Sequence, residues 1–337
     1  MSTPALPSFA NIGAVLVALE TTPGVEVVPG VPTASNFILA SDVTYTPEFE
    51  QVERNFMRPS FSRPLQRTSK LKASLTLTCE LMGSGTAIPA TPTAPQVLAA
   101  APAWGLLLQA CGMATTSVIT PAPSVGQLYT PTTVASTQKT ATIYVHMNGQ
   151  LHKMTGAMGT FTINMAAGEI GTITFNMNGN YLAPTVVADP TIPAQTIVPP
   201  LVGGQFNFNA GTLITDLEAS TITVDMGNQV VPRTSISTTN GIDGFFITGR
   251  SPQYTIDPER GTETALPFFS NLQNVPLTAA DITVGTTSGN RVHINLAKGQ
   301  LVGLAPTTRD NMLAYDLTYA LVSDTINGND ELSIRFS

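Results

Sequence analysis

The residues that could carry catalytic chemistry in this sequence are few, and their spacing does not assemble a site. Its three histidines are His146, His152 and His293. A nucleophilic hydrolase needs a Ser or Cys beside a His, with a third group that orients the base. Ser84 stands in Gly83-Ser84-Gly85 rather than in a G-x-S-x-G elbow, which favours a turn. We therefore predict no catalytic residue and no enzymatic activity.

Metal and cofactor sites are equally poorly supported. His146 and His152 flank a predicted turn at Asn148-Gly149 and could meet across a hairpin, but no third ligand follows at zinc spacing. The segment Asp324–Glu331 is rich in Asp, Asn and Gly, yet it fails the calcium-loop pattern and predicts a polar turn. No P-loop and no G-x-G-x-x-G after a strand is present. We predict no metal and no cofactor.

Composition favours an all-β fold. The 337 residues include 42% hydrophobic ones, which is enough for a sizeable core, but only 11% are charged, against the usual quarter or so. Threonine supplies much of the polar surface that charged residues usually provide. The chain contains 48 threonines, 27 glycines and 26 prolines. This mixture is typical of short strands and turns rather than long helices.

The sequence gives no sign of a secretory signal, a membrane span or a disulfide scaffold. The first basic residue is Arg54, so the N-terminus lacks the positive region of a secretory signal. The longest apolar stretch, Val97–Ala114, is interrupted by a proline and a glutamine, and it is a poor membrane span. Cys79 and Cys111 are too few for a disulfide scaffold, and we expect buried free thiols.

Charge is concentrated in one place. The formal net charge is −7, which disfavours nucleic-acid binding, and residues 201–337 hold 13 acidic and 7 basic residues. The segment Arg54–Lys72, between two predicted strands, holds six basic residues and no acid. It could be a solvated loop, a nucleic-acid contact or a contact with a protein partner. We favour contact with the acidic surface of another copy of the chain, which describes self-assembly.

The chain divides into four parts. We expect an extended N-terminal arm over residues 1–38, a first β-domain over 39–183, a Pro-rich linker over 184–202 and a second β-domain over 203–337. Period-2 alternation predicts strands in the first domain at 40–46, 73–81, 140–147, 159–165 and 171–181. One helix is predicted between them, over Ala101–Met113.

An internal repeat supports the two-domain division. A shift of 178 residues aligns Leu39–Thr44 with Leu217–Ile222 and Lys72 with Arg250. With a gap, the segment 159–181 also resembles 299–319 in its strand, turn, strand rhythm. The sequence thus predicts two tandem copies of one β-unit.

Four segments together carry a resemblance to a known family. They are Ala40–Glu48, the strand end Glu80–Gly85, the helix Trp104–Gly112 and the block Tyr144–Thr160. In this order they resemble the major tail tube protein of long-tailed, non-contractile bacteriophages, over roughly residues 14–185. The order of the segments, with one helix between an early hairpin and a G-x-x-G-T strand, is the specific part.

The resemblance implies a fold and a function. Members fold as a β-sandwich or barrel with one flanking helix, and they assemble into stacked rings whose hollow tube delivers DNA to the host. In them the long loop between the early strands reaches the next ring. The corresponding inter-ring contact here would involve Arg54, Arg58, Arg63, Arg67, Lys70 and Lys72.

Partners and location follow from the same resemblance. The expected partners are other copies of the chain and the tape measure, tail terminator and distal tail proteins, in a virion assembled in the host cytoplasm. DNA would pass through the lumen without specific binding, and no membrane would be involved. The second half departs from the simplest members, and it is either a second tube domain, giving three chains per ring, or an outer decoration.

A carbohydrate-binding β-sandwich on the virion surface, or secreted, is the main alternative. Such a decoration or receptor-binding module would need clustered exposed aromatic residues. The single tryptophan, Trp104, falls on the predicted helix, which argues against this alternative.

Overall fold

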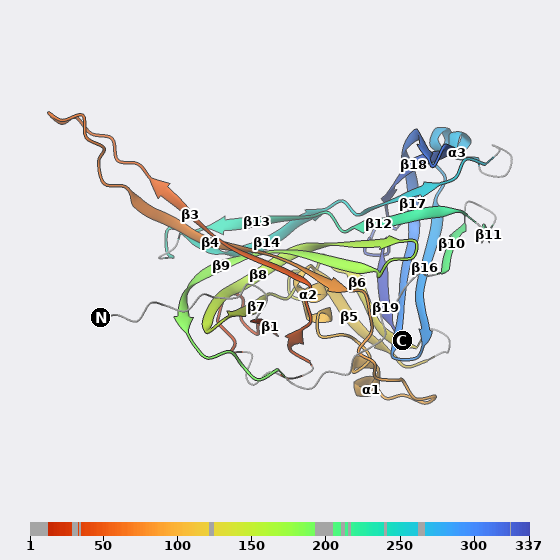
Figure 1. Cartoon of the computed structure of the whole chain (residues 1–337), viewed down its shortest axis with the longest axis horizontal. Coiled ribbons are helices and arrows are strands. Elements are labelled where there is room, and N and C mark those ends of the chain that lie inside the picture. Colours follow the sequence, from red (N-terminus) through yellow and green to blue (C-terminus); the bar gives the residue numbers. More distant parts are fainter. Residues whose placement is uncertain are drawn as a thin grey trace.

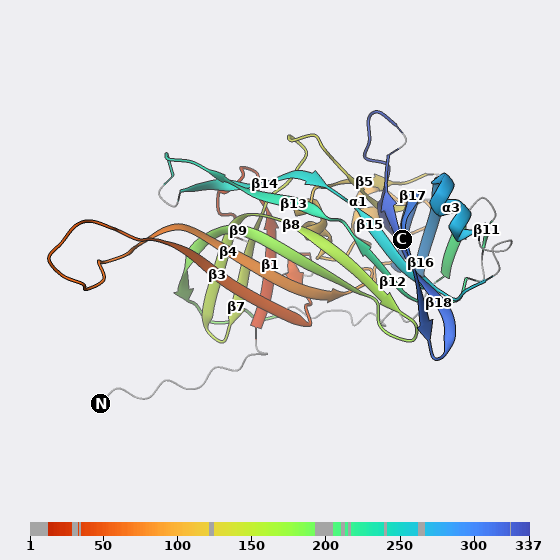
Figure 2. The same cartoon turned by 90° about the horizontal axis from the view of Figure 1, so that it is seen from above.

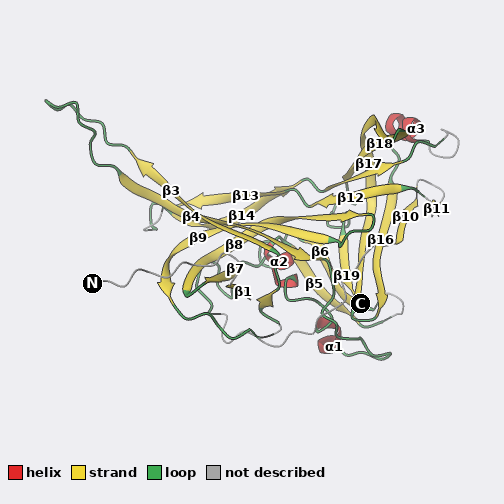
Figure 3. Cartoon of the chain, viewed as in Figure 1, coloured by secondary structure: helices red, strands yellow, loops and turns green. Residues whose placement is uncertain are grey.

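The computed structural model has an all-β fold, as predicted (Figures 1 and 3). It describes residues 13–28, 33, 35–120, 125–192, 205–209, 213–214, 217–238, 241–261, 267–323 and 325–337. Parts of the predicted N-terminal arm and of the predicted linker lie outside these residues. In the described part of the arm, residues 13–19 form a strand of the main sheet, and the predicted domain boundaries remain predictions.

The first half of the chain forms one run of antiparallel strands. Their order is β2-β1-β7-β8-β9-β4-β3. The bounds are β1 (Gly13–Leu19), β2 (Phe37–Ile38), β3 (Asp42–Val52), β4 (Arg67–Glu80), β7 (Ala141–Met147), β8 (Gln150–Ala166) and β9 (Thr172–Val186). The turn between β7 and β8 is the predicted Asn148-Gly149 hairpin, and both residues have the positive φ that this turn requires.

The second half repeats this strand order. Its run is β11-β10-β16-β17-β18-β15-β12, again antiparallel throughout. The bounds are β10 (Gln205–Asn209), β11 (Leu213–Ile214), β12 (Ala219–Asp225), β15 (Gln253–Pro258), β16 (Thr278–Thr287), β17 (Asn290–Arg309) and β18 (Met312–Leu321). The tandem arrangement predicted from the sequence repeat is therefore present in the topology.

The long hairpin β3–β4 has a counterpart in the second half that is broken in the middle. Its base is the pair β12–β15, and it continues as a separate two-stranded ribbon of β13 (Asn228–Thr234) and β14 (Ile242–Arg250). Gly227, with φ of 60°, lies at the break, where an added Cβ would clash with the Ser251 backbone. In Figure 1 both hairpins point the same way, and β3–β4 extends much further from the body.

The two halves are joined by strand pairing. The end of β8 pairs with β12, and β19 (Ser333–Phe336) pairs with both β17 and β6 (Gly126–Pro131). Strand β5 (Met113–Val118) completes this edge beside β6. As a result, 17 of the described strands belong to one connected sheet.

Helices are short and few. The predicted helix is observed as α2 (Gly105–Ala110), shorter than expected and preceded by α1 (Ala94–Leu98), while α3 (Phe268–Asn274) lies in the second half. Trp104 is buried at the start of α2, against Phe175 of β9 and Phe336 of β19. The core therefore spans both halves. No helix within the described residues is long and apolar enough to cross a membrane.

Candidate functional site

The hairpin β3–β4 forms an arm whose root is a regular two-stranded ribbon. Its strands pair from Asp42 opposite Thr78 to Val52 opposite Arg67, with one bulge between Phe49 and Glu50. On one side the arm continues the sheet, because β4 also pairs with β9. Beyond that pairing the ribbon leaves the body and ends in the loop 53–66 (Figures 1 and 2).

Two ion pairs connect the strands of the root. Lys72 lies directly opposite Glu48, and its Nζ is 2.6 Å from the Glu48 carboxylate. Lys70 Nζ is 2.8 Å from the Glu50 carboxylate. The hydrogen bond from Lys72 lowers the pKa of Glu48 below its ordinary value. These lysines are thus engaged within the arm itself.

The tip of the arm, defined as residues 53–66, exposes large apolar side chains. Met57 and Phe61 are fully exposed, and Leu65 is 86% exposed. Gln66 donates a hydrogen bond to Glu53 at 3.0 Å, which closes the base of the tip, and the loop lines an open hollow over residues 55–64. An apolar cluster of this kind on a projecting loop is typical of a binding surface rather than of a solvated connection.

Arginines surround these apolar groups. The guanidinium groups of Arg54 and Arg58 lie 5.5 and 6.0 Å from the centre of the Phe56 ring. Within the part of the chain that the structure describes, four arginines of the arm have no ion-pair partner: Arg54, Arg58, Arg63 and Arg67. Their charge is therefore available to a partner. Arginine beside aromatic and aliphatic groups is a combination enriched at protein interfaces.

The six basic residues predicted as a contact site do not all lie on the loop. Three of them, Arg54, Arg58 and Arg63, lie at the tip, whereas Arg67, Lys70 and Lys72 belong to β4. The sequence reasoning did not recognise the exposed apolar residues. The signal was present as Phe, Met and Leu interleaved with arginine, but hydrophobic residues are usually assigned to a core.

The histidines do not form a metal site. In the β7–β8 hairpin His146 lies opposite Leu151, and His152 lies opposite Val145, so the two imidazoles point to opposite faces of the sheet. Burial lowers the pKa of both. His293 bridges two hydroxyls, with Nδ1 3.0 Å from Thr283 Oγ1 and Nε2 3.1 Å from Ser337 Oγ. No metal-binding cluster of His, Cys, Asp or Glu occurs among the described residues.

The other candidate nucleophiles are structural. Ser84 Oγ donates to the Ala99 carbonyl oxygen at 2.5 Å and accepts from the Thr86 N–H at 3.1 Å, which is the turn expected from its glycine neighbours. Both cysteines are buried, and burial raises the pKa of Cys79 to about 12, so its thiol is protonated at neutral pH. Asp324, at the start of the calcium-like segment, lies outside the described residues.

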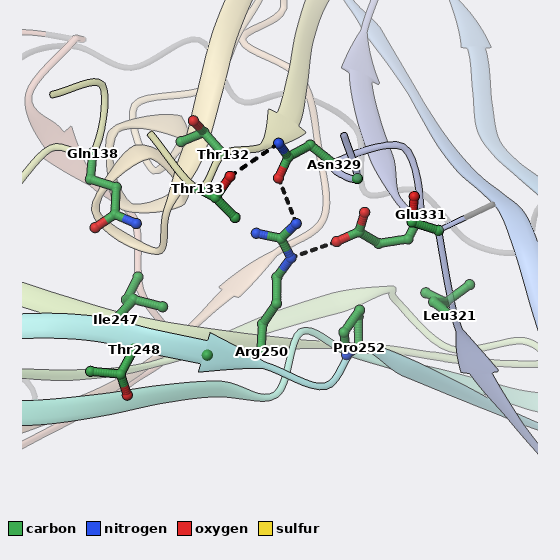
Figure 4. Close-up of a pocket in the computed structure, with 13 residues that line it drawn as sticks. Thr132, Thr133, Gln138, Ile247, Thr248, Arg250, Pro252, Leu321, Asn329 and Glu331 are labelled. Atoms are coloured by element: carbon green, nitrogen blue, oxygen red, sulfur yellow. Dashed lines mark hydrogen bonds and ion pairs between the residues drawn. The ribbon is translucent and has the colours of Figure 1, made fainter. Parts of the chain in front are cut away.

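A hollow of about 400 Å³ lies where the two halves meet, beside Arg250 (Figure 4). The Arg250 side chain is already engaged by Glu331 at 2.5 Å and by Asn329 Oδ1 at 2.6 Å. Asn329 in turn donates to Thr133 Oγ1 at 3.3 Å. Among the described residues that line this hollow none is aromatic, so they offer no stacking surface for a carbohydrate. The arm remains the stronger candidate site.

Comparison with known families gives a match that covers both halves of the chain. The model of a family described as phage tail tube protein matches residues 10–330. A comparison with curated protein sequences gives no match. The family match covers both halves and nearly the whole chain, which supports a structural component of the phage tail and gives no support to an enzyme or a sugar-binding module. The chain belongs to the phage tail tube protein family.

Proposed function

We propose that this chain self-assembles into rings that stack into the hollow tail tube through which DNA is delivered to the host. The observation that carries the proposal is the arm, because its tip places exposed apolar groups and uncompensated arginines away from the body of the subunit. A free monomer would hold this surface in water. Stacking buries it against the next ring.

The contact between rings is assigned to the tip together with the end of β4. Arg54, Arg58, Arg63 and Arg67 would meet acidic side chains of the neighbouring ring, and the excess of acid in residues 201–337 supplies the opposite sign. The role of Lys70 and Lys72 is different. They stiffen the root through their ion pairs, so that the tip is held at a fixed distance from the body.

Each ring would contain three chains. Two halves with the same strand order supply two tube domains per chain, and three chains then give six domains around the axis. The hairpins of the two halves are unequal, because the β13–β14 turn is short and the arm is long. Stacking contacts would thus alternate around the ring.

The tube would carry DNA without holding it. The net charge of −7 gives the assembled wall a negative field, which repels the phosphate backbone. The chain would also meet the tape measure, tail terminator and distal tail proteins, and assembly would take place in the host cytoplasm. No cofactor or catalytic step enters this function.

Negative-stain electron microscopy of the purified chain over a concentration series tests the proposal. We expect rings or tubes with a central channel. A chain that stays a dispersed monomer at millimolar concentration, measured in parallel by light scattering, would contradict it.

A further inference from the structure

The ribbon β13–β14 lies against the first half of the chain without pairing with it. Its two strands pair with each other and with no other strand that the structure describes. Strand β14 nevertheless packs on β8, β9 and β4 of the first half (Figure 1). The ribbon therefore crosses from its own half onto the sheet that carries the arm, and contacts other than strand pairing hold it there.

Asn228 fixes the base of the ribbon. Its Nδ2 donates hydrogen bonds to the carbonyl oxygens of Cys111 and Gly159, at 2.7 and 2.9 Å. Its backbone N–H donates to Thr160 Oγ1 at 3.1 Å. These three hydrogen bonds join the start of β13 to β8 and to the residue that follows α2.

Apolar side chains hold the middle of the ribbon. Ile242 and Phe245 form a buried cluster with Met158 of β8, and this cluster is separate from the main core. Phe245 is 3% exposed, whereas the next residue, Phe246, is 40% exposed. One face of the ribbon is therefore packed on the first half, and the other face meets solvent.

The tip of the ribbon meets the arm at the point where the arm leaves the sheet. Lys72 is the residue of β4 nearest the arm that still pairs with β9, and Lys70 lies just beyond it. Gly241, with φ of 71°, lies against Lys70, because a Cβ added to this glycine would be 3.3 Å from Lys70 Cγ. Both the positive φ and the close approach favour glycine at this position.

We infer that the β13–β14 ribbon is a brace that sets the direction of the arm, with Phe245 and Gly241 as positioning residues. An isolated two-stranded hairpin is only marginally stable, so an arm that leaves its sheet needs support to keep one direction. The ribbon supplies this support at the point of departure. A loop that is already held in its binding orientation loses less conformational entropy on association, so the brace favours stacking.

The two repeated hairpins thus have different roles. The first reaches toward the next ring, and the second, which is broken from its sheet at Gly227, holds the first in place. The inference rests on the proposed function for the purpose of the arm. The direction of the arm, however, is a property of a single chain and can be measured without tube formation.

Double electron–electron resonance on the dilute full-length chain measures how firmly the arm is held. One spin label is attached to the arm at Gln51→Cys and the other to the body at Thr116→Cys, both at exposed positions. The native cysteines are buried, so they take up little label. The width and the mean of the distance distribution between the two labels report the direction of the arm.

Phe245→Ala removes the packed side chain, and Phe246→Ala, on the outer face of the same strand, is the matched control. We expect Phe245→Ala to widen the distance distribution about twofold and to raise the concentration needed for tube formation about tenfold, because a loose arm must be ordered on stacking. Phe246→Ala should change neither quantity. The melting temperature of each variant shows that it is folded.

Gly241→Val tests the contact at the tip of the ribbon. It alters only a turn, so it carries the test even if Phe245→Ala unfolds the chain. The larger side chain should shift the mean distance between the labels, because it displaces Lys70. Gly168→Val is the control, since Gly168 also has a positive φ but a Cβ added there meets no atom within 4 Å.

A distance distribution that stays narrow and unshifted in both Phe245→Ala and Gly241→Val would overturn the inference and leave the proposed tube standing. Normal tube formation by a variant whose arm has lost its fixed direction would also overturn it. If the unaltered chain never forms tubes while both variants lose the fixed arm, the proposed function is wrong and the brace stands.

Discussion

Arg250, the last residue of β14, forms a buried ion pair with Glu331, two residues before β19, at 2.5 Å between Nε and Oε1. Their side chains are 15% and 6% exposed. The segment 322–332 separates β18 from β19, and both strands pair with β17, so the two behave as one strand with an inserted loop. The ion pair fixes this loop to the base of the β13–β14 ribbon, and Asn329 extends it to Thr133 of the first half.

Removing one partner of this pair should destabilise the fold. Glu331→Gln leaves the Arg250 charge buried without its counter-ion, and such a loss costs about 3–5 kcal/mol. Urea unfolding followed by circular dichroism measures the change. The combined Arg250→Met, Glu331→Leu variant should recover most of the loss, because it removes both charges.

The exposed pair in the arm is the matched control. Glu50→Gln breaks the ion pair between Glu50 and Lys70. The Lys70 side chain is 44% exposed and the Glu50 side chain is 56% exposed. The loss in the free energy of unfolding should therefore be only about 0–1 kcal/mol. Equal losses for Glu331→Gln and Glu50→Gln would show that the Arg250 pair is not structurally special.

Charge reversal in the arm should stop tube growth without unfolding the chain. Replacing Arg58, Arg63 and Arg67 with Glu reverses the charge at three residues that have no ion-pair partner among the described residues. Each single change should be tolerated, since exposed ion pairs contribute about 0–1 kcal/mol. Tube length in negative stain and the melting temperature are the two measurements. Tubes of normal length from the triple variant would contradict the assignment of the arm to stacking.

The apolar tip should contribute to assembly independently of charge. Phe61→Ser removes a fully exposed ring, so the melting temperature of the monomer should not change, while the concentration needed for tube formation should rise about tenfold. Ile236→Ser, at an equally exposed position in the β13–β14 turn, is the control and should have a smaller effect. If Ile236→Ser raised the concentration needed for tube formation more than Phe61→Ser does, the stacking contact would be assigned to the second hairpin instead.

His293 should make stability depend on pH. Burial, together with the positive charges of Arg335 and Arg291, lowers its pKa from 6.5 to about 4. Between pH 6.5 and pH 4, His293 is therefore protonated in the unfolded chain and neutral in the folded chain. The contribution of His293 to the free energy of unfolding is complete above pH 6.5 and is lost as the pH falls toward 4. The loss is about 2 kcal/mol once the partial exposure of His293 to solvent is allowed for.

The variant His293→Gln isolates this contribution. Its stability should fall less than that of the unaltered chain between pH 6.5 and 4, measured by urea unfolding at each pH. His146 and His152, whose pKa values are also lowered, remain in both chains, so their contribution cancels in the difference. Parallel pH profiles would contradict the role of His293.

Local patterns in the sequence predicted the fold class well. The alternation in Ala73–Leu81 appears in the structure as buried positions that alternate with half-buried or exposed ones along β4, and the Asn148-Gly149 turn forms as expected. The 178-residue repeat predicted the tandem topology, although the second hairpin is broken at Gly227. The alternation and the turn depend on residues close together in the chain, so local propensity was sufficient to predict them.

The contacts between halves could not be predicted in this way. The pairing of β8 with β12 and of β6 with β19 joins segments more than fifty residues apart, and nothing local distinguishes these edges from others. The same holds for the arm. Met57, Phe61 and Leu65 have the composition of a core, and only the three-dimensional fold shows that they face solvent.

The number of chains in one ring tests the central claim most directly. Cryo-electron microscopy of assembled tubes, with the chain traced through the density, gives this number. We predict three chains and six β-domains per ring, with both halves in the wall. Six chains per ring, with residues 203–337 projecting outward, would contradict the account.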